Sequence, residues 1–191
     1  MAGGSESSRG VTSTPVDFTI RSEEPKDAAA ISKIVTTAFG SPTEARLVEA
    51  IRASAHFVPE LSLVAEVDRH VVGHVMVSHV WLHEGDTRHR VTSLSPLAVA
   101  PDLQGRGIGS ELVRRVTARA DDRGEPLVVL EGSPAFYGRL GFEHSEPLGI
   151  EVALPSWAPP EAAQVLRLQS YDPAIRGRLV YPPAFDVVTE H

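Results

Sequence analysis

The part of the sequence that is most informative about the fold is Leu97-Ala98-Val99-Ala100-Pro101-Asp102-Leu103-Gln104-Gly105-Arg106-Gly107-Ile108-Gly109. An apolar run ends at Pro101, a glycine-dense turn follows, and a helical pattern starts directly after it. Glycine lets a ligand approach the backbone closely. The unpaired N–H groups of the first helical turn favour an anion. The stretch therefore predicts a strand, a loop that cradles a phosphate or pyrophosphate, and a helix.

The loop differs from two common phosphate-binding motifs. The chain has no G-x-x-x-x-G-K-[ST] segment, which argues against a P-loop nucleotide site. The spacing Gly105-x-Gly107-x-Gly109 is not that of G-x-G-x-x-G, and the order of elements before it does not fit a Rossmann unit. On the residues alone, the loop either holds another phosphate ligand or merely links a strand to a helix.

The elements around the loop predict an α/β fold with a mixed, mostly antiparallel sheet and helices on both faces. A short connection at 68–70 predicts an antiparallel hairpin, and Ser41, Pro42 and Glu44 predict a capped helix start. Only the strands at 91–100 and 127–130, joined through a helix, need to be parallel. Strands are expected at 16–21, 61–67, 71–83, 91–100, 127–130 and 163–168, and helices after Pro25, Ser41, Gly109 and Ser133.

Length and composition limit the class of protein. The chain has 191 residues, which fits one domain at 16–191 after a Gly/Ser/Thr-rich leader at 1–15 that we expect to be disordered. It contains no cysteine, which excludes disulfides, Cys-ligated zinc and a thiol nucleophile. Its net charge of −7 argues against a nucleic-acid partner. No secretory signal and no run of about 18 apolar residues is present, so we expect a cytoplasmic protein without a membrane segment.

A second motif follows the strand at 127–130. Ser133 is suited to an N-cap and Pro134 to the first helical position, while Gly141 ends the short helix. Tyr137 then lies about one turn from the cap. A second helix start is thereby placed beside the first, at the carboxyl ends of two parallel strands, where ligands bind in open α/β sheets.

From about Val16 to about Leu168, the chain resembles the GNAT superfamily of N-acetyltransferases in motifs and in element order. The family signature Q/R-x-x-G-x-G/A is met by residues 104–109, and the preceding L-x-V-x-P-x-x-Q pattern by residues 97–104. The stretch Gly177-Arg178-Leu179-Val180-Tyr181-Pro182-Pro183-Ala184-Phe185 adds a likeness to a bacterial subgroup of predicted acetyltransferases. The resemblance implies the GNAT fold and acetyl-CoA as co-substrate, without a metal.

The resemblance also implies roles for individual residues. In the family, the loop amides hold the pyrophosphate of CoA, and the end of the preceding strand pairs with the pantetheine arm. Tyr137 would protonate the departing thiolate, whereas Phe136 is expected in the core. Ser133 stands where the family often has Asn. The implied CoA site consists of Leu97, Ala98, Val99, Gln104, Gly105, Arg106, Gly107, Ile108, Gly109, Ser110 and Ser133.

Direct acetyl transfer needs a base, or a chain of waters, to remove a proton from the acceptor amine. No candidate has a sequence context that singles it out. A zinc site from His79, His83 and His89 lacks a fourth ligand and the usual spacing. The candidates for the base are His74, His79, His83, Glu44, Glu49 and Glu66.

We therefore expect an enzyme that moves the acetyl group of acetyl-CoA directly to a primary amine of a small molecule or peptide. An acetyl-cysteine route is excluded because the chain has no cysteine. Two alternatives stay open: a module that senses acyl-CoA without turnover, and an acyltransferase for a longer acyl-CoA. A homodimer is a candidate assembly, and the acceptor is left open.

Overall fold

The computed structural model describes residues 15–189, so the predicted leader lies outside the described residues except for Pro15. Within residues 15–189, nine strands form one mixed sheet in the order β1-β2-β3-β4-β5-β8-β6, while β9 pairs with β3 and β7 with β9. The strands are β1 (Thr19–Ser22), β2 (Ser62–Val67), β3 (His70–Glu84), β4 (Thr87–Val99), β5 (Leu127–Glu131), β6 (Glu143–His144), β7 (Ile150–Glu151), β8 (Ala163–Arg167) and β9 (Gly177–Val180).

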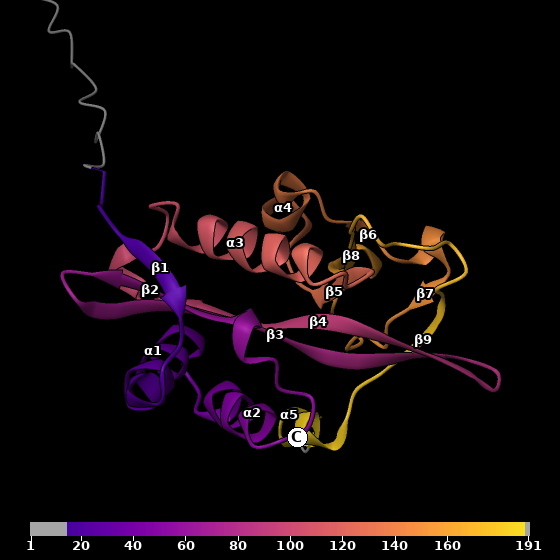
Figure 1. Cartoon of the computed structure of the whole chain (residues 1–191), viewed down its shortest axis with the longest axis horizontal. Coiled ribbons are helices and arrows are strands. Elements are labelled where there is room, and N and C mark those ends of the chain that lie inside the picture. Colours follow the sequence, from indigo (N-terminus) through magenta and orange to yellow (C-terminus); the bar gives the residue numbers. More distant parts are fainter. Residues whose placement is uncertain (1–14, 190–191) are drawn as a thin grey trace, which may run out of the picture.

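Helices cover both faces of the sheet, as predicted. Figure 1 shows α1, α2 and α5 on one face and α3 and α4 on the other. No helix within the described residues is long and apolar enough to cross a membrane. The α-helices are α1 (Ala28–Phe39), α2 (Thr43–Arg52), α3 (Ile108–Asp122), α4 (Pro134–Tyr137) and α5 (Asp186–Thr189).

The core has two halves, one on each side of the sheet. Successive strand side chains point to opposite faces, so Val64 packs in the half under α1 and α2 and its neighbour Leu63 in the half under α3. Met76 and Val75 on β3 divide in the same way. Because both faces are covered, these strands read as continuous apolar runs in the sequence.

Strands β4 and β5 separate halfway along β4. They pair in parallel at Thr92 and Ser93, as predicted, but no later residue of β4 pairs with β5. From Leu94 to Val99, β4 keeps only its antiparallel partner β3, and a register shift at Val75–Val77 marks the point of departure. A shift of this kind bends a strand. The end of β4 therefore presents an open backbone edge toward β5.

Several details differ from the sequence expectations. The first strand starts at Thr19 rather than at 16, and β7 and β9 form a second parallel pair. The Ser41 hydroxyl accepts the N–H of Thr43 at 3.1 Å, but α2 begins one residue later than predicted. Glu44 closes no capping box; its Oε2 is buried without a hydrogen-bond partner among the described residues.

Candidate active site

The glycine loop ends in a helix start that no side chain caps. Gly105 and Gly107 have φ of 74° and 85°, in the left-handed region that favours glycine. Gly107 is the N-cap of α3, and no side chain accepts a hydrogen bond from the first turn. The N–H groups of that turn lack intrahelical acceptors and carry the positive end of the helix dipole. The structure therefore forms the anion cradle that the sequence predicts.

A cleft of about 530 Å³ opens in front of this cradle. Of the predicted CoA residues, Ala98 and Ile108 are instead buried in the core, Arg106 is exposed outside the lining, and Ser133 is the N-cap of α4. The cleft brings together Leu97, Val99, Gln104, Gly105, Gly107, Gly109 and Ser110, joined by Leu103, Phe136 and Arg139.

Gly109 keeps the floor of this cleft open. A Cβ at this position would lie 3.8 Å from Leu97 Cδ2 and 3.7 Å from Phe136 Cζ, two atoms of the cleft wall. Gln104 Nε2 donates a hydrogen bond to the carbonyl oxygen of Val99 at 3.0 Å and ties the loop to the end of β4. A cleft that runs from an open strand edge to a helix N-terminus fits an elongated ligand that carries phosphates.

Sequence reasoning missed three residues of this cleft, Leu103, Phe136 and Arg139. Phe136, expected in the core, packs against the core and also lines the cleft. Arg139 adds a guanidinium, whose Nε donates to the carbonyl oxygen of Ala135 at 3.0 Å. A spacing of three residues places Phe136 and Arg139 on one side of a helical turn, and this spacing was the available signal.

Tyr137, the last residue of α4, packs near the end of β5 and does not line the cleft. Its ring covers Gly132, where an added Cβ would come within 2.5 Å of Tyr137 Cε2. Edge-to-face contacts with Phe136 and Phe142, at centroid distances of 4.8 and 5.5 Å, hold the ring in place. Burial raises the pKa of Tyr137 to about 12, so the hydroxyl is protonated at neutral pH.

A second cleft, of about 520 Å³, lies on the side of the sheet covered by α1, α2 and α5. It reaches β4 at Ser93–Ser95, where β4 leaves β5. The first cleft borders β4 further along, at Leu97 and Val99, so the two clefts border the separated part of β4 from opposite faces of the sheet. The wall of this second cleft is mostly apolar, and its polar members are Glu44, Ser93, Ser95, Glu131 and Tyr181.

Glu131 and Tyr181 form a pair in the second cleft. The Tyr181 hydroxyl donates a hydrogen bond to Glu131 Oε1 at 3.0 Å. Desolvation raises the pKa of the Glu131 carboxyl. Burial and the neighbouring carboxylate raise the pKa of the Tyr181 hydroxyl, which therefore stays protonated. Neither residue was among the predicted site residues, because no local pattern joins them.

Most of the other base candidates are engaged elsewhere. His74 is fully buried, its Nε2 lies 3.1 Å from Ser62 Oγ, and burial lowers its pKa. His79 Nε2 lies 3.0 Å from Glu125 Oε1. His83 and the exposed Glu49 are absent from the lining of both clefts. Of the predicted bases, Glu44 alone is a residue of the second cleft.

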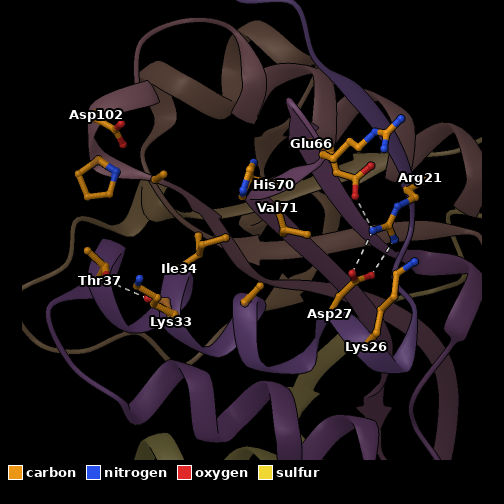
Figure 2. A pocket seen from close by; sticks show the side chains of 14 residues that line it. Arg21, Lys26, Asp27, Lys33, Ile34, Thr37, Glu66, His70, Val71 and Asp102 are labelled. Carbon is orange, nitrogen blue, oxygen red and sulfur yellow. Dashed lines mark hydrogen bonds and ion pairs between the residues drawn. The ribbon is translucent and has the colours of Figure 1, made fainter.

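The remaining candidate, Glu66, belongs to a third cavity of about 830 Å³ over α1. Figure 2 shows the Arg21 guanidinium between Asp27 and Glu66, with Nη–O distances of 2.6 and 2.7 Å, and His70 and Asp102 across the cavity. No lining residue is shared with the two clefts at the sheet opening. Within residues 15–189, no group of three or more His, Asp or Glu side chains could hold a metal ion.

Comparisons with known proteins agree with this geometry. Residues 28–142 match the model of the acetyltransferase (GNAT) family. The uncharacterized N-acetyltransferase YjhQ of Escherichia coli is 32% identical over 126 residues, which is 66% of this chain and 70% of that protein. The crystal structure of YhbS, a GNAT family N-acetyltransferase from Escherichia coli in complex with CoA, superposes with a TM-score of 0.80 at 30% identity and covers 92% of this chain and 95% of that one.

A second solved structure is a GNAT family acetyltransferase from Brucella melitensis in complex with acetyl-CoA. It superposes with a TM-score of 0.72 at 31% identity, over 89% of this chain and 99% of that one. The predicted family, fold and enzyme class are confirmed. The chain belongs to the GNAT family and is an acetyl-CoA-dependent N-acetyltransferase.

Proposed function

We propose that this enzyme transfers the acetyl group of acetyl-CoA directly to a primary amine, with Tyr137 as the acid and Glu131 as the base. The proposal depends chiefly on the two clefts that border the separated part of β4 from opposite faces of the sheet. The donor occupies the cleft at the glycine loop, as CoA and acetyl-CoA are bound by the YhbS and Brucella relatives. The acceptor enters from the cleft that contains Glu131.

The donor side is built for an anionic, extended molecule. The N–H groups at the start of α3 and the Arg139 guanidinium hold the pyrophosphate. Arg106, exposed on the loop, reaches the outer phosphates, and Ser133 stands at the start of α4. Residues 97–99 offer their open backbone edge to the pantetheine arm. When bound, acetyl-CoA supplies the thioester, the activated form of the acetyl group.

Proton transfer is assigned to two groups at the end of β5. Glu131 accepts a proton from the acceptor ammonium, and the freed nitrogen forms a bond to the acetyl carbon as the carbon–sulfur bond breaks. Tyr137 donates its hydroxyl proton to the departing sulfur and regains one from solvent. Glu131 and the new amide nitrogen each release one proton to solvent, so one proton is released for each acetyl group transferred. The Tyr181 hydroxyl orients the Glu131 carboxylate. The Tyr137 ring covers the Gly132 backbone, and Gly132 follows Glu131 directly in the sequence. The acid and the base are therefore close together.

The test measures thiol release with acetyl-CoA and a panel of aminoglycosides, polyamines, amino acids and peptide N-termini. Tyr137→Phe should lower the rate by about 100-fold, since general acid catalysis contributes on that order, while the affinity for acetyl-CoA stays unchanged by calorimetry. Tyr171→Phe, which removes a hydroxyl outside both clefts, is the matched control and should keep full activity.

Three outcomes would contradict the proposal. Full activity of Tyr137→Phe would remove the acid role. Binding of acetyl-CoA by the wild type without thiol release for any amine would favour a sensor. Faster turnover with a longer acyl-CoA than with acetyl-CoA would reassign the donor.

A further inference from the structure

The second cleft carries negative charge that has no cation to balance it. None of the described residues that line it is a lysine, an arginine or a histidine. Two of them are carboxylates on different elements: Glu44 in the first turn of α2 and Glu131 at the end of β5. A cleft of this composition attracts cations and excludes anionic molecules.

One polar group of this cleft is buried without a hydrogen-bond partner among the described residues. It is Glu44 Oε2, an oxygen of one of the two carboxylates. The hydroxyl of Ser93, a residue only 1% exposed, interacts with the Tyr181 hydroxyl. Buried polar groups are nearly always paired, so an orphaned carboxylate oxygen in a cleft points to a ligand that supplies the missing donor.

Most of the rest of the wall is apolar. Phe39, Leu47, Leu94, Leu179 and Phe185 come from α1, α2, β4, β9 and the turn before α5. A volume of about 520 Å³ lies in the range of small-molecule sites, about 300–1,000 Å³. An occupant of matching chemistry has an apolar body and nitrogen cations for the carboxylates.

We propose that the acceptor is a small diamine, in which an apolar linker joins the reacting primary amine to a second cationic nitrogen held by Glu44. The inference builds on the proposed function and names the substrate class of that same site. Glu131, the last residue of β5, takes the reacting nitrogen. Glu44 binds the far end of the molecule, where it positions the substrate and selects it.

The test uses three amines of equal chain length that differ at one end: hexamethylenediamine, hexylamine and aminocaproate. With saturating acetyl-CoA, kcat/KM should be at least about 10-fold higher for the diamine than for the monoamine, and lowest for aminocaproate, whose carboxylate would face Glu44. In Glu44→Gln the ratio of diamine to monoamine should fall to about one, mainly through KM of the diamine.

Glu49→Gln is the matched control, because Glu49 lies on the same helix but is exposed and outside the cleft. It should leave the preference for the diamine unchanged. Since Glu44 Oε2 has no partner to lose, Glu44→Gln should unfold at the same urea concentration as the wild type or a higher one. This measurement separates a lost substrate contact from a damaged fold.

Failure of the inference and failure of the proposed function give different results. Equal acetylation of hexylamine and the diamine, or preference for aminocaproate, would overturn the diamine inference and leave acetyl transfer intact. If no primary amine releases thiol, the proposed function fails. Calorimetry of the diamine with the protein–CoA complex then tests the cation site by itself. Binding that weakens at least about 10-fold in Glu44→Gln supports the cation site, and absence of binding overturns it.

Discussion

Gly109→Ala separates the stability of the fold from the affinity for the donor. The residue is the second of α3, and an added Cβ would make ordinary contacts of 3.6–3.8 Å with Val99, Phe136 and Leu97. The fold therefore has room for the methyl group. Alanine is a better helix former than glycine by about 0.5–1 kcal/mol, so the free energy of unfolding should stay unchanged or rise by up to that amount.

The same methyl group would occupy the floor of the donor cleft between Leu97 and Phe136. A ligand that rests there has to shift, and overpacking of this kind costs about 1–3 kcal/mol. Each 1.4 kcal/mol is about a tenfold change in Kd, so the affinity for CoA should fall by about 5- to 150-fold. Urea unfolding and isothermal titration calorimetry with CoA measure the two effects on one sample.

Gly138→Ala is the matched control for this experiment. It makes the same chemical change in the turn after Tyr137, where an added Cβ has nothing within 4 Å and lies outside the cleft. Its affinity for CoA should equal that of the wild type. Wild-type affinity in Gly109→Ala would refute the placement of the donor at the glycine loop, and a loss of stability above about 1 kcal/mol would refute the packing argument.

Two further predictions concern the scaffold. In Gly177→Ala, at φ +124°, the Cβ would overlap the His83 backbone, so the free energy of unfolding should fall by more than about 3 kcal/mol. In Gly40→Ala, where φ is +70° and the space around the Cβ is open, it should fall by only about 1 kcal/mol. Equal losses of the two variants in urea unfolding would disprove the overlap. The Arg21 hydrogen bond holds the pKa of Asp27 below its usual range, so this pair stabilises the fold above pH about 4 and its contribution is lost as pH falls through the folded-state pKa. Asp27→Asn should therefore lose about 1.5–3 kcal/mol at neutral pH, and its deficit should shrink in acid; a deficit independent of pH down to about 2 would contradict the assignment.

The donor cleft could be predicted from the sequence because its determinants are local. The end of β4, the glycine loop and the start of α3 are consecutive, so one stretch at 97–110 specifies strand, turn and helix together. The hairpin of β2 and β3 and the parallel pairing of β4 with β5 followed from short connections and from chain direction. Arg139 was missed although the sequence predicts a helix up to Gly141, because no local pattern shows that its side chain lies beside the glycine loop.

The acceptor cleft could not be predicted because its residues are distant in the sequence. Tyr181 and Glu131 are 50 positions apart and come together only because β9 adds to the edge of β3. Glu44 was predicted both as a member of a capping box, a local role that the structure does not bear out, and as one of six candidate bases that no pattern distinguished. No periodicity encodes such meetings, since they depend on how the tail of the chain returns over the sheet.

The position of the two clefts on opposite faces of the sheet, where β4 separates from β5, also bears on how an acidic chain binds an anionic donor. On the face covered by α3, the proposed phosphate cradle consists of neutral backbone N–H groups and Arg139. It therefore does not require a net positive charge of the whole chain, whose net charge is −7. On the face covered by α2, Glu44 and Glu131 line the other cleft without a basic neighbour among its lining residues. In the proposed function, the sheet thus separates an anion site for the donor from a cation site for the acceptor. Acetylation of an amine bound in that way would remove the positive charge of the nitrogen beside Glu131 and weaken the binding of the product at the reacting end.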